Sequence, residues 1–521
     1  MDLPPSIFND VIGPVMRGPS SSHCAAAVRI GRMAHDLMAG RIERLLLEFD
    51  AAGSLAHTHT EQGSDTGLFA GLLGWDADDE RLPQAGEELA RRGVAVEIRV
   101  GPYGDPHPNT YRLTLEGGGE RRAMIALSTG GGMVEVTSID GISLSLRGDR
   151  HVTLLAADRR FPPADLPAGF PPGAEVLAHG GEPTVLIELR TPAPLPAEFL
   201  RELARLPGVR WVRPIRPVLP VLTRPDIRVP FLSCAEMLAW NRGRDLDLTA
   251  LAAAYESARG GIPEEEVFRR MQRVAGILAR SIEQGLSGTD FPDRILPAQA
   301  PAFRAALSRG GLIDSGVLNR MVLYAAALME VKSAFGTIVA APTAGSCGAV
   351  PAAVFGLVDT LALGAPGAAS GLLAAGMIGV FVAAHATFAA ELGGCLAECG
   401  AASAMAAAAL VALSRGSAPQ AAAAASMALQ NVLGLVCDPV ANRVEVPCLG
   451  RNVLAVANAL SCANLALAGF DPVIPLDETI AAMADVGRRL PPELRCTGGG
   501  GLSLTPTARA IARRLAARRK D

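Results

Sequence analysis

The strongest constraint on the fold of this chain is a long Ala-rich stretch with helical periodicity, which runs from about residue 232 almost to the end. In segments such as EEEVFRRMQRVAGILARSIEQGL and SGVLNRMVLYAAALMEVKSAFG, apolar residues recur three and four positions apart, the spacing of one helix face. Aromatic residues make up only 4% of the chain, and small side chains allow helices to approach closely. We therefore predict a large all-helical domain over residues 226–521.

The first 160 residues have a different pattern. Clusters of Gly, Pro and Asp separate short apolar or alternating runs, which indicates strands with an occasional helix. These runs lie at 96–100, 110–115, 124–128 and 152–157. We predict an α+β domain over residues 1–160.

Between these two parts the sequence predicts a linker and a small fragment over residues 161–225. Residues 161–178 are rich in Pro and Gly, as linkers are, and residues 179–222 show a strand, a helix and a strand. This fragment is like half of a βαβ-type regulatory module, and its pattern predicts no particular effector. The expected fold class is thus multidomain, with α+β structure followed by an all-α domain.

Length and charge narrow the kinds of partner. The 521 residues can build several cores, and 48 basic against 52 acidic residues leave a formal charge of -4. This balance argues against nucleic acid or an anionic membrane as the main partner and favours a small molecule. Residues 368–384 are apolar enough to suggest a membrane span. Their Ala and Gly content, without flanking aromatic belts, instead favours a helix buried in a bundle.

The nine cysteines are expected to be reduced. The first residues, MDLPPSIFND, lack the basic and apolar regions of a signal peptide, which predicts a cytoplasmic protein. Cysteines in such a protein are thiols, buried apolar residues or metal ligands rather than disulfides.

Three cysteines lie at predicted helix ends. Cys395 precedes an Ala-rich helix, Cys437 ends the next helix, and Cys448 follows Pro447 at the start of another. Helix N-termini stabilise thiolates, and thiolates are the ligands of iron-sulfur clusters. Spacing alone does not distinguish such ligands from buried, inert cysteines.

The sequence segments around these cysteines, and others near the N-terminus, resemble those of a known family. The segments are KSAFGTIVAAPTAGSCGAVPAAV at 332–354, ELGGCLAECGAASAMAAAAL at 391–410, CDPVANRVEVPCLGRN at 437–452, GPSSSHCAAAVRIG at 18–31, GSLAHTHTEQGSDTGLFAGLLGW at 53–75 and HPNTYRLTL at 107–115. Taken in their order along the chain, and over most of its length, these segments resemble the iron-sulfur-dependent L-serine dehydratases, or L-serine ammonia-lyases.

The resemblance implies a small α+β domain joined to a helical catalytic domain that holds a four-iron four-sulfur cluster. Cys395, Cys437 and Cys448 match the three ligands of that cluster. Three ligands leave one iron open, and an open metal position can act as a Lewis acid on the substrate hydroxyl. The implied reaction converts L-serine, or a close β-hydroxy amino acid, to a 2-oxo acid and ammonia.

Two short segments carry groups that could bind the substrate carboxylate. After Gly18-Pro19, a tight loop offers hydroxyls and amides, and the PTAG segment offers backbone amides ahead of a helix. The residues concerned are Ser20, Ser21, Ser22, His23, Thr343, Ala344 and Gly345. A Ser-rich helix cap is the alternative interpretation of the first segment.

A histidine is the expected general base. We predict His59 in this role, with His23 and His57 as alternatives, because Gln62 stands near the place of the family histidine. Asp65 could orient the base or cap a helix. Lys332 could serve the substrate carboxylate or the cluster charge, or could cap a buried helix end.

The chain departs from the family pattern elsewhere. Ala344 stands where many members have Asn, and Ser403 stands where a cysteine is common, so the substrate need not be serine. Some members bring a C-terminal cysteine to the open iron, whereas this chain ends LAARRKD. Cys496 is the candidate for that role here. Cys347 is expected near the site without being a ligand, and packing roles are expected for Cys24, Cys234, Cys399 and Cys462.

Three other functions remain open at this stage. A pyridoxal-phosphate lyase would need a Schiff-base lysine, and the only lysines are Lys332 and Lys520. A zinc-containing lyase could use the same thiols, although C-x-x-C pairs are absent. A non-catalytic metabolite-binding protein is the third possibility. A homodimer through the smaller domain is expected by analogy.

Overall fold

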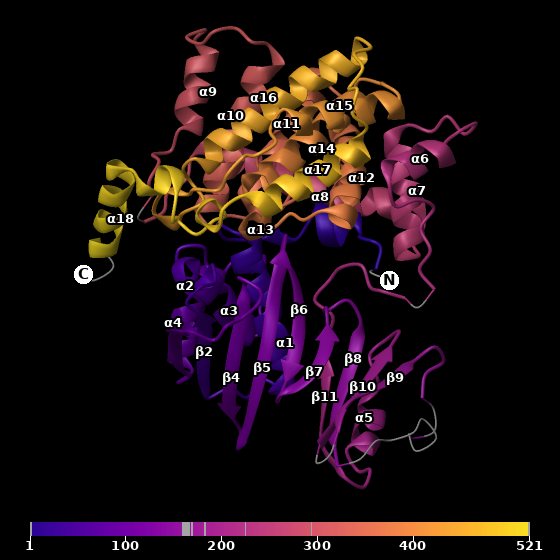
Figure 1. The fold of residues 1–521 in the computed structure, drawn as a ribbon, viewed down its shortest axis with the longest axis vertical. Coiled ribbons are helices and arrows are strands. Elements are labelled where there is room, and N and C mark those ends of the chain that lie inside the picture. Colours follow the sequence, from indigo (N-terminus) through magenta and orange to yellow (C-terminus); the bar gives the residue numbers. More distant parts are fainter. Residues whose placement is uncertain are drawn as a thin grey trace.

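The computed structural model describes residues 3–158, 167, 170–181, 184–224, 226–292 and 294–518. A helical domain lies above two separate β-sheets (Figure 1). The predicted fold class, α+β structure followed by a helical domain, is confirmed.

A six-stranded sheet forms the first part. Its order is β3 (Ala95–Gly101), β2 (Arg44–Asp50), β4 (Thr110–Gly117), β5 (Glu120–Gly130), β6 (Met133–Ile139) and β7 (Ile142–Leu146). Only the β2–β3 pair is parallel. Alternate residues of β4 are buried beneath the helices α1 (Ala26–Leu37) and α3 (Ser64–Leu72), which matches the alternation in the sequence. The short helices α2 (Leu55–Thr58) and α4 (Ala85–Arg91) complete this part.

Glycines allow α1 and α3 to pack backbone against backbone. A Cβ atom on Gly71 of α3 would lie 2.2 Å from the carbonyl oxygen of Val28, and one on Gly31 of α1 would lie 2.4 Å from that of Leu68. Because real Cβ atoms do not approach so closely, only glycine fits at this crossing. The crossing matters for function, since α1 continues directly from the Ser20–His23 segment.

The second sheet has four strands in the order β11 (Val209–Ile215), β8 (His151–Ala157), β10 (Thr184–Thr191) and β9 (Glu175–Gly181). Helix α5 (Ala197–Leu203) connects β10 to β11, which lie on either side of β8, so these elements form a split βαβ unit. The boundary predicted at residue 160 therefore falls one strand after the change of sheet. Residues 161–166 and 168–169 of the predicted linker lie outside the described residues.

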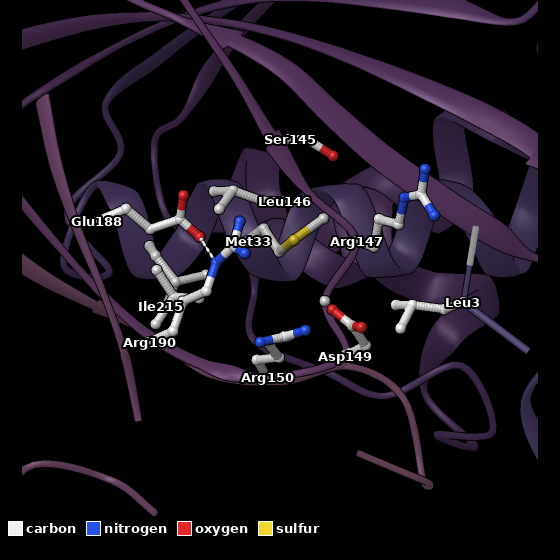
Figure 2. A pocket seen from close by; sticks show the side chains of 12 residues that line it. Leu3, Met33, Ser145, Leu146, Arg147, Asp149, Arg150, Glu188, Arg190 and Ile215 are labelled. Carbon is white, nitrogen blue, oxygen red and sulfur yellow. Dashed lines mark hydrogen bonds and ion pairs between the residues drawn. The ribbon is translucent and has the colours of Figure 1, made fainter. Parts of the chain in front are cut away.

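A cavity of about 290 Å³ lies where β7 and β8 meet (Figure 2). Its lining is mainly polar. On β10, Arg190 Nε donates to Glu188 Oε1 (2.5 Å). Arg147, Asp149 and Arg150 come from the connection between the two sheets.

The helical domain has its most apolar helices in the centre. Its helices are α6 (Cys234–Trp240), α7 (Leu248–Gly260), α8 (Glu264–Ser287), α9 (Ala300–Ser308), α10 (Val317–Ser333), α11 (Ala349–Thr360), α12 (Gly364–His385), α13 (Ala390–Cys395), α14 (Ala401–Leu413), α15 (Ala418–Gln430), α16 (Cys448–Leu467), α17 (Leu476–Arg489) and α18 (Pro506–Arg518). Helix α14 packs against α11, α12, α15 and α16. Its Ala-rich surface is buried on nearly every side, as its lack of a polar face requires.

Two helical segments are long and apolar enough to cross a membrane, namely Gly364–His385 and Ala390–Leu413. Of their most apolar windows, 78% and 83% are buried inside the fold. Burial in the bundle therefore accounts for their composition, as the sequence predicted for residues 368–384.

The first residues of the chain pack into the helical domain. Residues 6–12, here called the N-terminal arm, form a short π-helical turn (Ile7–Val11) whose apolar side chains join the core around α12. Glu256 of α7 accepts hydrogen bonds from Ser6 Oγ (2.5 Å) and the Ile7 amide (2.7 Å). Next, β1 (Val15–Met16) pairs with β12 (Ile338–Val339). The arm thus completes the helical core, although the predicted boundaries place it in the first domain.

Candidate active site

The candidate site lies where the six-stranded sheet and its helices meet the helical domain. Five segments that are distant in sequence converge there. They are residues 20–25, 54–65, 343–348, 391–400 and 437–452, and Cys496 joins them from the segment before α18.

Cysteines form the centre of this site. The ligand atoms of Cys395, Glu398 and Cys437 lie within 4.8 Å of one another. Cys496 is buried in the same apolar cluster as Cys395 and Cys437. Cys448, at the first position of α16, is close enough for its titration to depend on Cys395. Cys395, Cys437 and Cys496 are thus brought together, and Cys448 lies near enough to Cys395 to feel its charge.

The backbone around the thiols has little freedom. Gly394 has a φ of 68°, in the left-handed region, and a Cβ atom there would lie 2.9 Å from the Leu435 carbonyl oxygen. The Cys437 amide donates to the Leu494 carbonyl (2.8 Å), and the Cys496 amide donates to the Cys437 carbonyl (3.0 Å). These bonds tie Cys496 to Cys437.

The electrostatics of the cluster fit a bound cation. Hydrogen bonds with Cys395 and with Cys496 raise the pKa of the Cys437 thiol well above its usual value, and burial adds to this. Burial likewise raises the pKa of Cys448, with Cys395 adding to the effect. Crowded, buried thiols cannot all ionise unless positive charge compensates them, and metal binding supplies that charge. Thiolate and carboxylate groups are metal ligands, so the sulfurs and the Glu398 carboxylate gathered here fit a bound metal group.

Two cationic side chains lie beside the thiols. Arg451 donates from Nη1 to Cys395 Sγ (3.2 Å) and from Nη2 to Asp438 Oδ1 (2.5 Å). Lys332 is completely buried, its Nζ donates to the Val444 carbonyl, and its charge lowers the pKa of Cys448. Lys332 is therefore close to the cluster.

Sequence reasoning did not include Glu398 among the site residues. Its Oε1 accepts a hydrogen bond from Thr343 Oγ1 (2.6 Å), and burial raises the pKa of its carboxyl group to about 7 despite that bond. Gly345 lies so close that a Cβ atom there would be 2.5 Å from Glu398 Oε1. In the sequence, only the position of Glu398, three residues after Cys395, could have indicated that it belongs to the site.

The two predicted substrate-binding segments meet at one contact. The Ala344 amide donates to Ser21 Oγ (3.2 Å), and Thr343 caps the short turn that contains Ala344 and Gly345. Asn452, one turn into α16 from Cys448, donates to the Gly345 carbonyl (2.8 Å). The PTAG segment therefore lies between the serine loop and the cysteines.

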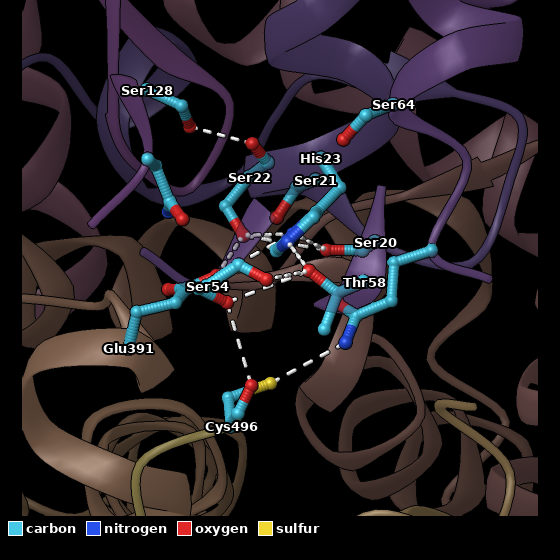
Figure 3. Close-up of polar contacts among 12 residues, drawn as sticks. Ser20, Ser21, Ser22, His23, Ser54, Thr58, Ser64, Ser128, Glu391 and Cys496 are labelled. Carbon is cyan, nitrogen blue, oxygen red and sulfur yellow. Dashed lines mark hydrogen bonds and ion pairs between the residues drawn. The ribbon is translucent and has the colours of Figure 1, made fainter. Parts of the chain in front are cut away.

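His23 is the hub of a buried polar network (Figure 3). Its Nδ1 contacts the hydroxyls of Ser20 (3.2 Å) and Ser22 (3.1 Å), and its Nε2 contacts Thr58 Oγ1 (2.8 Å). Ser22 Oγ also donates to Glu391 Oε1 (2.8 Å). Burial lowers the pKa of His23, which favours a neutral ring. Both of its nitrogens are therefore engaged.

His59 has a different environment. Its Nδ1 lies 2.8 Å from Asp65 Oδ1, and its ring lies 5.1 Å from that of Phe49. The side chain is 20% exposed, and among the described residues its Nε2 has no hydrogen-bond partner. His57 is exposed at the surface. Gln62, at the place where the family histidine was sought, donates to Cys496 Sγ (3.4 Å) and joins the small domain to the cysteines.

The remaining cysteines are all buried. Cys347 packs against Met329, and burial raises its pKa to about 12. Cys399 lies nearer the site than its predicted packing role suggested, because its titration depends on Cys395 and Cys448 as well as on burial. Ser403 donates to the Ala455 carbonyl (2.9 Å) and so joins α14 to α16. Lys520 lies outside the described residues.

Comparison with known proteins adds an independent observation. Residues 228–503 match the family described as the serine dehydratase alpha chain. A probable L-serine dehydratase alpha chain of Bacillus subtilis (strain 168) is 36% identical over 285 residues, which are 55% of this chain and 95% of the relative. The L-serine dehydratase alpha chain of Peptoniphilus asaccharolyticus is 38% identical over 271 residues, 52% of this chain and 93% of the relative.

A relative of a second type, a beta chain, also matches part of this chain. A probable L-serine dehydratase beta chain of Bacillus subtilis (strain 168) is 38% identical over 156 residues, which are 30% of this chain and 70% of the relative.

Proposed function

Because the chain belongs to the serine dehydratase alpha-chain family, we propose that it is an L-serine ammonia-lyase, which converts L-serine to pyruvate and ammonia. The observation that carries this proposal is the convergence of cysteines and serine hydroxyls at one buried junction. The segment 54–65, which reaches this junction through Ser54 and Gln62, also carries the Asp-paired His59. The similarity to a beta chain supports the view that two functional parts are fused here.

Cys395, Cys437 and Cys448 would hold a four-iron four-sulfur cluster, since thiolates are its usual ligands. With three protein thiolates for four irons, the bound cluster would supply a Lewis-acidic iron for the substrate hydroxyl. The contacts of Cys496 with Cys437 support a role as the resting fourth ligand. Arg451 and Lys332 would balance the negative charge of the thiolates.

His59 is the proposed general base. Asp65 holds Nδ1, so that Nε2 is left to take the α-proton of the substrate. His23 is less suited to this step, because hydroxyl groups engage both of its nitrogens. We assign it to positioning Ser22 and Thr58.

The serine loop and the PTAG turn would bind the substrate. Their hydroxyls and amides face one junction, where the Ala344 amide meets Ser21. Once water has left, the aminoacrylate product tautomerises and hydrolyses in solution, so no further residue is needed for release of ammonia. A cytoplasmic location and a homodimer stay predictions.

The test is to replace Cys437 with Ser and purify the protein without oxygen. Iron content and pyruvate formation from L-serine should fall together to near zero. Cys234→Ser is the control, because Cys234 is equally buried but lies on α6, outside the site. Iron-free protein that releases ammonia at the wild-type rate would refute the proposal, and stoichiometric zinc in place of iron would favour a zinc lyase.

The pyridoxal-phosphate alternative is less consistent with the structure. Lys332 is the only lysine among the described residues. Its Nζ donates to a backbone carbonyl, and its side chain is completely buried.

A further inference from the structure

One motif of the small domain has no role in the proposal above, namely the HPNT segment at 107–110. Asn109 of this segment is fully buried. Neither its Oδ1 nor its Nδ2 has a hydrogen-bond partner among the described residues. Because an unpaired buried amide is costly, its presence indicates that something else bonds to it.

The direction of this amide follows from the sheet register. The Ser128 amide donates to the Asn109 carbonyl (3.1 Å), which extends the pairing of β4 with β5 by one residue. Side chains of directly opposite residues lie on the same face of a sheet. Ser128 Oγ donates to the Ser22 carbonyl (2.6 Å), so the Asn109 side chain lies on the face that carries the serine loop.

Tyr111 gives a second indication of the same direction, because residues two apart in a strand share a face. Its hydroxyl donates to the His23 carbonyl (3.4 Å) and to Ser64 Oγ (3.0 Å). Asn109 therefore faces the segment that contains Ser22 and His23.

Glu391 presents an unpaired atom to the same segment from the opposite domain. Its Oε1 accepts from Ser22 and lies 3.4 Å from His23 Nδ1. Its Oε2 is buried and has no partner among the described residues. The side chain is only 2% exposed, and Figure 3 shows it beside Ser22.

The two unpaired groups belong to adjoining parts of the interface. A Cβ atom on Gly130, at the end of β5, would lie 2.9 Å from Ala389 Cβ. The strand end that carries Ser128 thus abuts the start of α13, which carries Glu391 and ends at Cys395.

We propose that Asn109 and Glu391 form the subsite for the charged end of an α-amino acid substrate. The α-ammonium group donates to Glu391 Oε2 and Asn109 Oδ1, and Asn109 Nδ2 donates to the α-carboxylate. Every unpaired atom named above then has a partner, and the buried carboxylate faces a cation. This inference rests on the proposed function, and it adds that a free α-ammonium group is required for binding.

The first test uses wild-type holoenzyme and two ligands that are not dehydrated. L-Alanine keeps both charged groups, whereas L-lactate replaces the ammonium by a hydroxyl. Calorimetric titration should show binding of L-alanine at least tenfold tighter than binding of L-lactate, and L-alanine should compete with L-serine. Equal binding of the two, or no L-alanine binding, would overturn the subsite.

The second test uses Glu391→Gln and Asn109→Ala with their iron content verified. Each should weaken L-alanine binding and raise KM for L-serine at least tenfold, with a smaller effect on kcat. Glu330→Gln is the matched control, because Glu330 also has a buried, unpartnered Oε2 but caps α9 instead. Unchanged L-alanine affinity in both variants would refute the proposal.

Asn109→Asp covers the case in which Asn109→Ala does not fold. It keeps the side-chain shape and the acceptor for the ammonium group but replaces the donor to the α-carboxylate by a carboxylate oxygen, so L-alanine affinity should fall relative to wild type. Failure of the proposed function gives a different result. Wild-type protein would then bind L-alanine and not L-lactate, yet form no pyruvate from L-serine.

Discussion

At the scale of single residues, the two histidines His23 and His59 have different environments, and we propose different roles for them. His23 is enclosed by hydroxyls, whereas His59 is held on one side by Asp65 and is open on the other. A general base needs a free ring nitrogen that carries no proton. A carboxylate partner on the other nitrogen holds the proton there and so fixes the tautomer. We therefore prefer His59 to His23 as the base because of their hydrogen bonds, and not because of their distances from the cysteines.

We expect His59→Ala to lower kcat for L-serine roughly 100- to 10,000-fold, the usual contribution of a general base. Asp65→Asn should lower it less, because Nε2 remains but its tautomer is no longer fixed. Both variants should keep wild-type iron content, as neither residue contacts a cysteine among the described residues. Near-normal turnover in His59→Ala would move the base elsewhere, with His23 tested next.

The sequence indicated which cysteines gather at the candidate site better than it indicated their neighbours. Cys395 and Cys448 lie at helix ends, where local pattern and motif agree. Glu398 could not be selected in the same way, and Cys496 was proposed as a candidate without any local pattern that places it beside Cys437. Cys496 reaches the site only because its backbone pairs with Cys437, a contact between distant segments that no local pattern encodes.

At the scale of elements, glycines rather than large apolar residues determine the packing of α1 on α3. This crossing orients the serine loop, since that loop leads straight into α1. The glycines in GSDTGLFAGLLGW are visible in the sequence, but only the structure shows that two of them face a backbone.

We expect Gly71→Ala to destabilise the small domain by about 1–3 kcal/mol, the usual cost of overpacking, because its Cβ would strike the Val28 carbonyl. The measurement is the free energy of unfolding in urea. Gly276→Ala in α8 is the control, since its Cβ would meet only the flexible end of Arg280 and alanine favours helices. A Gly71→Ala protein as stable as wild type would show that the helices can separate at no cost.

Element types were more predictable than element partners. Helical periodicity marked α8 and α10, and short alternating runs marked β3 and β4. The run at 152–157 was correctly predicted as a strand, but a strand's own residues do not specify which sheet it joins. That choice depends on β10 and β11, which come later in the chain.

At the scale of the whole molecule, the N-terminal arm joins the beginning of the chain to its helical half. Gly376 and Gly379 of α12 make room for it, because Cβ atoms there would lie 2.6 Å from Ile7 Cγ2 and 2.1 Å from Val11 Cγ1. The arm is short and adjoins strand-like sequence, so its attachment to a distant helix could not be predicted from local patterns.

The attachment of the arm should depend on pH. Burial raises the pKa of Glu256 to about 7, with Asp10 adding to this and Arg259 and the arm's hydrogen bonds opposing it. The folded state therefore binds this proton more tightly than the unfolded state, so the stabilisation is full below about pH 4.5 and is lost as pH rises through 7. The Tm of wild type relative to Glu256→Gln should thus fall between pH 5 and 8. A constant difference would contradict this origin.

The path of the arm also bears on what would happen if the polypeptide were cut. The arm precedes both sheets in sequence, yet it is embedded beside α12, and β1 is hydrogen-bonded to β12. Cleavage between β11 and α6 would therefore not by itself free the two products, since the first retains an anchor inside the second. The two fragments of a cleaved molecule would stay associated, and the candidate site between them would stay assembled without a continuous main chain.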